Sequence, residues 1–305
     1  MRHVVICILI FLIPLAASGQ LYPASDYYVR DALIVNPAYA GSQDALSISI
    51  FDRFSWLGFE GAPKTMSLSI HAPLNNERIG LGLFMTSDII GITSETNLAG
   101  NYALRMDMGR GKLALGLGFG INMQRTDWVN LAFQDPGDEL LVNNVVSGVM
   151  PNFSLGIYYS TREYFIGLSL PMFLSSEFDA GQDKFIVKND FKEYKYIFNA
   201  GYHFDLNQYT RLLPTLSAKY QNGNDLQINI GSQVILKSRF WLGAFYRSNK
   251  IMAGVFQARI NDQLRVAYSY DFMVGNGAPY KFSSHEVMLN YVFKYQTNIT
   301  GPRKF

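Results

Sequence analysis

The strict two-residue alternation of residues 111–123 is the feature that most constrains the fold of this chain. Every second position from Leu113 to Met123 carries a large apolar side chain, and the positions between carry alanine, glycine or asparagine. Successive side chains of a β-strand point to opposite faces, so one face of this segment is apolar and the other is small or polar. An α-helix would scatter the large residues around its circumference, and its glycines would destabilise it. The segment therefore predicts a strand with two unlike faces.

Segments of this kind recur along the chain, and we count fourteen, each of roughly the ten residues that a tilted strand needs to cross a bilayer. A soluble sandwich strand can show the same alternation, with its apolar face in the core. Two segments, 240–247 and 251–259, are apolar on both faces, so the alternation leaves their register open. The fourteen segments are 46–50, 66–72, 79–85, 98–106, 111–123, 153–159, 164–170, 194–206, 212–220, 226–236, 240–247, 251–259, 264–272 and 287–295.

The lengths of the joins between segments distinguish a membrane barrel from a sandwich. Joins after even-numbered segments are short, whereas the joins after odd-numbered segments include every long one: 55–63, 88–93, 124–149, 172–193 and 273–283. Short turns at one end and long loops at the other are typical of porin-type barrels, and an even strand count leaves both chain ends in the periplasm. We therefore predict an all-β fold, a transmembrane antiparallel up-and-down β-barrel of about 14 strands over residues 44–295.

The two ends of the chain indicate export to an outer membrane. Residues 1–19 combine a basic start, a short apolar run and small residues before Gln20, which is typical of a secretory signal peptide. The single cysteine, Cys7, lies in that segment. Residues 20–43 form an irregular leader, and residues 296–305 a polar tail, and we expect both in the periplasm. No later apolar run reaches the 18 residues of a membrane-spanning helix.

Composition and motifs exclude several function classes. With 26 basic and 24 acidic residues the chain is nearly neutral, which disfavours nucleic-acid binding. We find no catalytic, cofactor-binding or metal-binding motif, and expect no enzyme and no cofactor. His71 shares a face with Ser67 and Ser69, so a lumenal hydrolase is conceivable, but a polar lumen wall is the simpler interpretation. The acidic string 135–139 is either a calcium loop or a solvated acidic loop.

Large aromatic residues occur in two loops on the predicted outer side. Trp56 and Phe59 lie in loop 55–63, and Trp128 and Phe133 in loop 124–149. Exposed aromatic side chains are favoured anchors for protein partners. They could instead fold inward and close the barrel. Either arrangement leaves little free pore.

Three short motifs resemble one known family. The leader ends in Asn36-Pro37-Ala38-Tyr39-Ala40-Gly41, Trp56 opens a W-x-G-x-x-G-A-P pattern, and Ser284-His285-Glu286 opens the last segment. In these features the mature chain resembles the PorP/SprF family of Bacteroidota outer-membrane proteins. Residues 124–275 carry no motif that we can match.

The resemblance implies a component of the type IX secretion and gliding machinery, without enzymatic activity. Its partners would be a secreted surface protein with a type IX sorting domain, held by the outer loops, and periplasmic components of the machinery. We expect the leader to contact these components through Tyr27, Tyr28, Asn36, Pro37, Tyr39 and Gly41. The alternative function is a passive or substrate-selective pore for small solutes.

Overall fold

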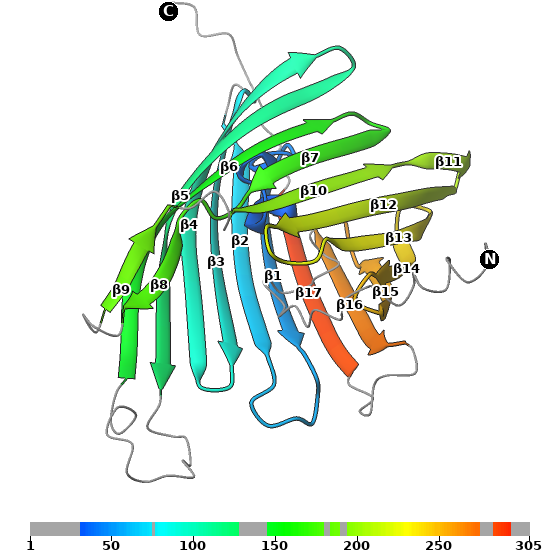
Figure 1. Ribbon diagram of the computed structural model, residues 1–305. Coiled ribbons are helices and arrows are strands. Elements are labelled where there is room, and N and C mark those ends of the chain that lie inside the picture. Colours follow the sequence, from blue (N-terminus) through cyan, green and yellow to red (C-terminus); the bar gives the residue numbers. More distant parts are fainter. Residues whose placement is uncertain are drawn as a thin grey trace, which may run out of the picture.

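The computed structural model describes residues 31–74, 77–127, 145–179, 184–189, 194–274 and 283–293. In this structure the strands wrap into a single barrel (Figure 1). The predicted signal peptide and the polar tail lie outside the described residues. So do four residues to which we assigned partner contacts, namely Tyr27, Tyr28, Trp128 and Phe133.

The barrel is a closed antiparallel sheet with fourteen strand positions, as predicted. Its bonding order runs from β10 through β7 to β1, on to β17 and back to β11. Closure occurs where β1 pairs with β17 and where β10 pairs with β12. Because β10 and β11 both pair with β12, they are two parts of one interrupted strand and occupy one strand position. The barrel strands are β1 (Leu46–Phe54), β2 (Lys64–Pro73), β3 (Ile79–Ile90), β4 (Thr93–Met108), β5 (Gly111–Asp127), β6 (Val145–Ser160), β7 (Tyr164–Leu170), β10 (Lys195–Tyr202), β11 (Phe204–Asn207), β12 (Thr210–Gln221), β13 (Gln227–Leu236), β14 (Phe240–Arg247), β15 (Ile251–Arg259), β16 (Leu264–Met273) and β17 (Ser283–Phe293).

The two faces of the strands point as the alternation predicts. On β5, Leu115, Leu117 and Phe119 are exposed on the outside of the barrel, whereas Ala114 and Asn122 are buried inside it. An apolar outer band and a small or polar interior suit a barrel whose outside is solvated by lipid. Closure removes the unpaired strand edges that a bilayer cannot hydrogen-bond.

The register of β14 and β15, which alternation left open, is settled by burial. Phe245 and Arg247 of β14 face inward, as do Ala253 and Val255 of β15, while Leu242 and Phe256 face outward. Register pairs such as Phe245 with Ala253 join the inward residues of the two strands.

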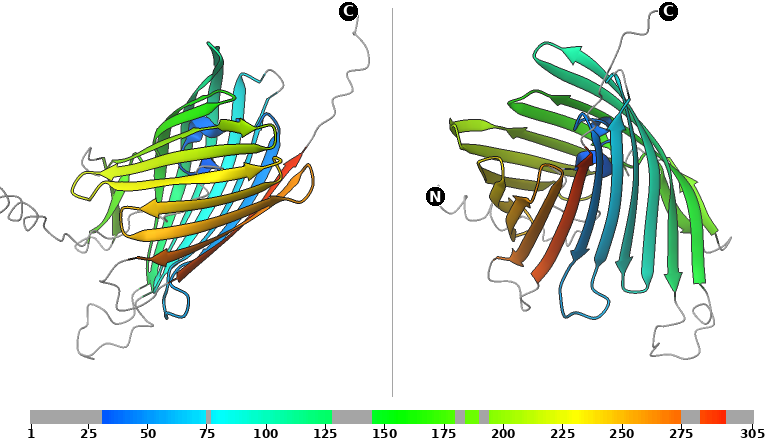
Figure 2. Two further views of the ribbon diagram at one scale, coloured as in Figure 1. Left: turned by 90° about the vertical axis from the view of Figure 1, so that its right-hand side faces the viewer. Right: turned by 180° about the vertical axis from the view of Figure 1, so that it is seen from behind.

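Three predicted joins are wrong in detail. The loop predicted over 124–149 is shorter, because β5 continues to Asp127 and β6 begins at Val145. We expected a loop over 172–193, and the structure contains a separate hairpin there, β8 (Ser175–Asp179) with β9 (Lys184–Lys188). We expected a join over 88–93, but β3 and β4 stay paired up to Ile90 and Thr93. At the last of these joins the polar residues Thr86, Ser87 and Asp88 interrupt the hydrophobic alternation while strand pairing continues. Figure 2 shows the β1–β2 and β3–β4 connections at the same end of the barrel.

The described part of the leader lies inside the barrel. Two short 3₁₀ helices, η2 (Ala32–Ile34) and η3 (Pro37–Tyr39), occupy the lumen (blue in Figure 1). We call residues 31–41 the strap. It packs near the short turns, and therefore in the periplasmic half of the lumen. Among the described residues, no helix has the length and apolar character needed to span a membrane.

Candidate functional site

The strap is shaped by its own side chains. The Asp31 carboxylate accepts a hydrogen bond from the backbone N–H of Leu33 (3.3 Å) and so caps η2. The side-chain oxygen Oδ1 of Asn36 accepts a hydrogen bond from the backbone N–H of Ala38 (3.0 Å) and so caps η3, in which Pro37 is the first residue. Asp and Asn are favoured at such caps, and proline suits the first helical position. The irregular leader thus has a defined local structure.

Three hydrogen bonds tie the strap to the barrel wall. Ser69 of β2 donates to the carboxylate of Asp31. Asn36 donates from its side-chain nitrogen to the backbone oxygen of Ile157 on β6 (3.1 Å). The backbone N–H of Gly41 donates to Nδ1 of His71 on β2 (3.1 Å). The imidazole that a lumenal hydrolase would require therefore accepts a hydrogen bond from the strap instead.

Glycines on the inner wall form a flat seat for the strap. A Cβ atom at Gly80 would lie 2.0 Å from the backbone oxygen of Ala40, and one at Gly116 would lie 2.1 Å from the backbone nitrogen of Ala38. At Gly156 it would lie 2.0 Å from the side-chain oxygen of Asn36. These positions are on β3, β5 and β6, and they allow backbone to approach backbone. Gly116, on the small face of residues 111–123, therefore belongs to the surface that receives the strap.

Apolar side chains of the strap fill the space above this seat. Leu33, Val35 and Ala40 are fully buried. The Tyr39 ring is buried edge-on between His71 and Tyr158, with centroid distances of 5.4 Å to each. Burial, with the negative charge of Asp31 as a smaller cause, raises the pKa of Tyr39 to about 12. Packing of this kind excludes water from the part of the lumen that the strap occupies.

A buried ionic cluster occupies the opposite wall, nearer the long loops. Arg53 of β1 contacts Asp271 of β16 and Glu286 of β17, both at 2.7 Å, and Arg247 of β14 contacts Asp271 at 2.9 Å. All four side chains are buried. They lie beside the apolar cluster formed by Phe51, Phe245, Ala253, Val255, Ala267 and Met288. Opposite charges at inward positions of neighbouring strands are the signal that could have predicted this cluster, which our sequence reasoning missed.

Loop 55–63 forms an exposed platform at the outer end of the barrel. The N–H of Leu57 donates to the backbone oxygen of Ser283 (3.0 Å), and the N–H of Gly91 donates to that of Gly61 (2.9 Å). The loop is thus tied to the start of β17 on one side and to the β3–β4 turn on the other. Leu57 and Phe59 are 63% and 57% exposed.

The predicted outer anchors are placed differently by the structure. Phe59 is exposed, as a contact residue should be. Trp56 is half-buried, and its backbone N–H donates a hydrogen bond to Ser284 Oγ (3.4 Å). Leu57, which we did not single out, is the most exposed large apolar residue of the loop. Its place between Trp56 and Phe59, in a loop outside the strands, is the signal that could have indicated it.

The predicted leader contacts lie inside the barrel. Asn36, Pro37 and Tyr39 are buried. Gly41 has a φ of 75°, which lets the chain turn from the strap toward β1. Their contact with periplasmic components stays a prediction.

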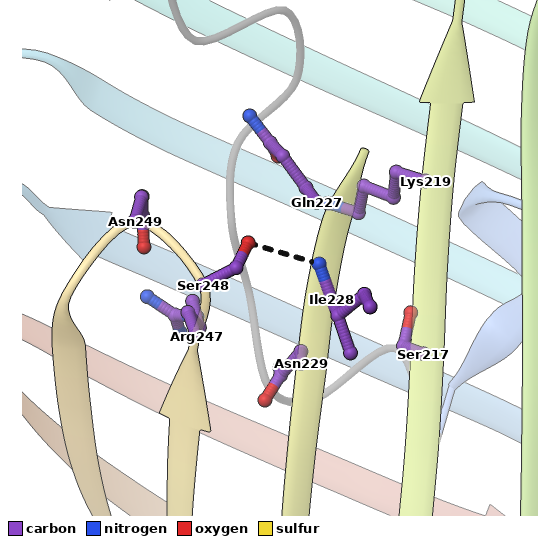
Figure 3. Close-up of a pocket in the computed structure, with 8 residues that line it drawn as sticks. All are labelled: Ser217, Lys219, Gln227, Ile228, Asn229, Arg247, Ser248 and Asn249. Carbon is purple, nitrogen blue, oxygen red and sulfur yellow. Dashed lines mark hydrogen bonds between the residues drawn. The ribbon is translucent and has the colours of Figure 1, made fainter. Parts of the chain in front are cut away.

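Figure 3 shows a small open pocket beside the short β12–β13 and β14–β15 connections. Lys219 of β12, Asn229 of β13 and Asn249 of the β14–β15 turn line it, and Ser248 Oγ accepts a hydrogen bond from the N–H of Ile228 (3.1 Å). Within the described part of the chain, no group of three or more His, Cys, Asp or Glu side chains could hold a metal ion.

Comparisons with known proteins agree with this architecture. Residues 16–291 match the family described as type IX secretion system membrane protein PorP/SprF. The structure is similar to that of the Ralstonia pickettii toluene transporter TbuX, with a TM-score of 0.55, 9% identity, and coverage of 91% of this chain and 96% of that one. It is also similar to the Acinetobacter baumannii outer membrane protein Omp33, with a TM-score of 0.49, 6% identity, and coverage of 82% and 98%. At these identities the likeness concerns the fold alone. A search of curated protein sequences finds no match.

Proposed function

Because the chain belongs to the PorP/SprF family of type IX secretion system membrane proteins, we propose that it holds a secreted surface protein at its outer rim while its lumen stays closed. The barrel resides in the outer membrane, with its long loops outside and its short turns in the periplasm. The finer assignment, a partner with a type IX sorting domain bound to the outer loops, rests on the outer platform.

The single observation that supports this assignment is the exposure of large apolar side chains on an anchored loop. Leu57 and Phe59 stand in solvent above the membrane, and Ile90 of the hydrogen-bonded neighbouring turn is also 57% exposed. Apolar groups clustered outside the lipid-facing band are costly unless a partner covers them. Because loop 55–63 is tied at both sides, it would lose little conformational freedom on binding.

The packed lumen supports a holder rather than a small-solute pore. The strap fills the periplasmic half of one wall, and the Arg53 cluster fills the outer half of the other. A pore would require a continuous water-filled path through the lumen, and the buried side chains of the strap and of the Arg53 cluster argue against such a path. The periplasmic partners remain part of the proposal, because the strap and its entry point lie at the periplasmic end.

The platform can be tested by replacing Leu57 and Phe59 together with serine in the native host. We expect the amount of surface protein recovered with the barrel from outer membranes, measured by quantitative mass spectrometry, to fall at least about tenfold, because anchor residues of this kind each contribute about 2 kcal/mol.

The matched control is Met108→Ser. Met108 is 56% exposed and ends β4 at the opposite, periplasmic rim. Recovery should be unchanged in this variant. Unchanged recovery in the Leu57→Ser, Phe59→Ser variant, at equal barrel levels, would show that the partner is held elsewhere.

A further inference from the structure

A small open cavity lies beside Gln43, which follows the strap. Its lining is completed by Gln257 of β15, by Arg265, Val266 and Ala267 of β16, and by Met288 and Asn290 of β17. The short 260–263 turn joins β15 to β16, and Gln43 lies just before β1. Both features place the cavity in the periplasmic half of the lumen.

Two arginines stand side by side on this wall, and one of them, Arg265, lines the cavity. Arg259 of β15 is the direct cross-strand partner of Arg265 of β16. Arg259 follows the buried Gln257 by two positions, so the two residues share the inward face. Arg265 lines the cavity, and its guanidinium carbon lies 5.9 Å from the centre of the Trp241 ring. Like charges directly opposite one another in a sheet are destabilising unless something offsets them.

The acids that the structure describes in the lumen are engaged elsewhere. Asp271 and Glu286 bind Arg53 in the outer half. Asp44, at the start of β1, binds Arg105 at 2.6 Å on the other side of the strap. Asp262 is exposed on the turn between the two arginines. Asp31 of the strap accepts hydrogen bonds from Ser69 and from the Leu33 N–H. Among the described residues, no ion pair to Arg259 or Arg265 is formed, so neither guanidinium charge is neutralised by direct contact with an acid.

We propose that this cavity binds a carboxylate carried on an acidic peptide segment that enters from the periplasm. A guanidinium presents a planar fork of donors that matches a carboxylate, and two adjacent forks with the neighbouring Gln43 and Gln257 amides supply more donors than one carboxylate can use. The cavity leaves room for a carboxylate group and not for a folded domain, so the ligand is an extended segment of a periplasmic protein that reaches past the rim.

This site is independent of the outer platform. It depends on charges at the periplasmic end, and the platform depends on apolar side chains outside the membrane. A peptide-binding experiment on the purified barrel can therefore fail while the surface partner is still held, and the reverse also applies.

The test measures fluorescence anisotropy of a labelled hexaglutamate peptide with the purified full-length barrel in a neutral detergent at low ionic strength, where charge interactions are least screened. We expect saturable binding, and no binding of a hexaglutamine peptide. Arg265→Gln and Arg259→Gln should each weaken hexaglutamate binding by about tenfold or more.

The matched control is Arg211→Gln. Arg211 is at the same end of the barrel, is half-exposed, and pairs with Asp205 at 2.7 Å. It should leave the affinity unchanged. Heat-dependent migration on gels would confirm that each variant is folded, and Arg259→Gln, at the end of its strand, keeps the test decisive if Arg265→Gln does not assemble.

Two results would overturn the proposal. Equal affinity of the wild-type and Arg265→Gln or Arg259→Gln barrels would show that the arginine pair does not bind the peptide. Competition by free glutarate as strong as that by hexaglutamate, at equal carboxylate concentration, would show a site for small anions and not for a peptide segment.

Discussion

Single glycines decide whether the strap can be seated. Along β5 the inward positions alternate with large outward residues, and the sequence pattern alone identifies them as a small face. The sequence pattern cannot show why these inward residues are small, because glycine also suits close strand packing and tight bends. The distance of 2.1 Å between a Cβ at Gly116 and the Ala38 nitrogen supplies the reason, a backbone that lies directly on the strand.

Gly116→Val should destabilise the barrel by about 1–3 kcal/mol, because the strap backbone or the strand must move to admit the side chain. The measurement is the midpoint of the heat-induced gel shift. Gly100→Val is the matched control, since a Cβ at this outward-facing position of β4 meets nothing within 4 Å. If both variants melt at the wild-type temperature, the close contact between strap and β5 is not present in the folded protein.

The buried ion pairs make a second prediction at this scale. Arg53→Met removes the buried guanidinium that contacts both Glu286 and Asp271, which should cost about 3–5 kcal/mol. Urea unfolding in detergent micelles measures the loss.

Arg125→Met serves as its control, because Arg125 is 62% exposed and lies 3.9 Å from Asp127. Exposed pairs of this kind contribute about 0–1 kcal/mol. Equal unfolding midpoints for the two variants would mean that the cluster of Arg53, Arg247, Asp271 and Glu286 does not support the fold.

At the scale of elements, the strands were predictable and the strap was not. A strand that faces lipid on one side shows its alternation directly in the sequence, so the barrel strands and their outward faces could be predicted from the amino-acid sequence. The five-residue segments of the β8–β9 hairpin, SSEFD and KFIVK, show no such alternation. The strap has caps at Asp31 and Asn36, but nothing local indicates that its apolar residues pack against a wall of distant strands.

Asn36 is the residue through which the strap can be loosened alone. Asn36→Ala removes both the cap on η3 and the bond to Ile157 on β6, so residues 31–41 should exchange their amide hydrogens faster while the barrel strands keep their protection. Hydrogen–deuterium exchange of peptides covering the strap measures this.

Gln43→Ala is the comparison for this experiment, because the Gln43 side chain makes one long bond of 3.5 Å to the Tyr39 hydroxyl. It should change the exchange of the strap little. Exchange in the Asn36→Ala variant that matches the wild type would contradict the anchoring of the strap through this side chain.

For the whole molecule, the interior determines the kind of function. A barrel of fourteen strands is wide enough to conduct when its lumen is empty. Here the strap and the Arg53 cluster lie inside the barrel on different walls, and the likeness to transport barrels concerns the wall and not its contents. Sequence reasoning could predict the wall and the outward loops, but long-range filling of the lumen depends on which residues meet across it, and no local pattern records that.

The most direct test of a closed lumen is the conductance of the purified barrel in planar bilayers. The account predicts no steady current for the wild-type protein, and the appearance of steady current when residues 31–41 are deleted from a barrel that still assembles. Large steady currents through the intact wild-type protein would contradict it, and would favour a pore for small solutes over a closed holder.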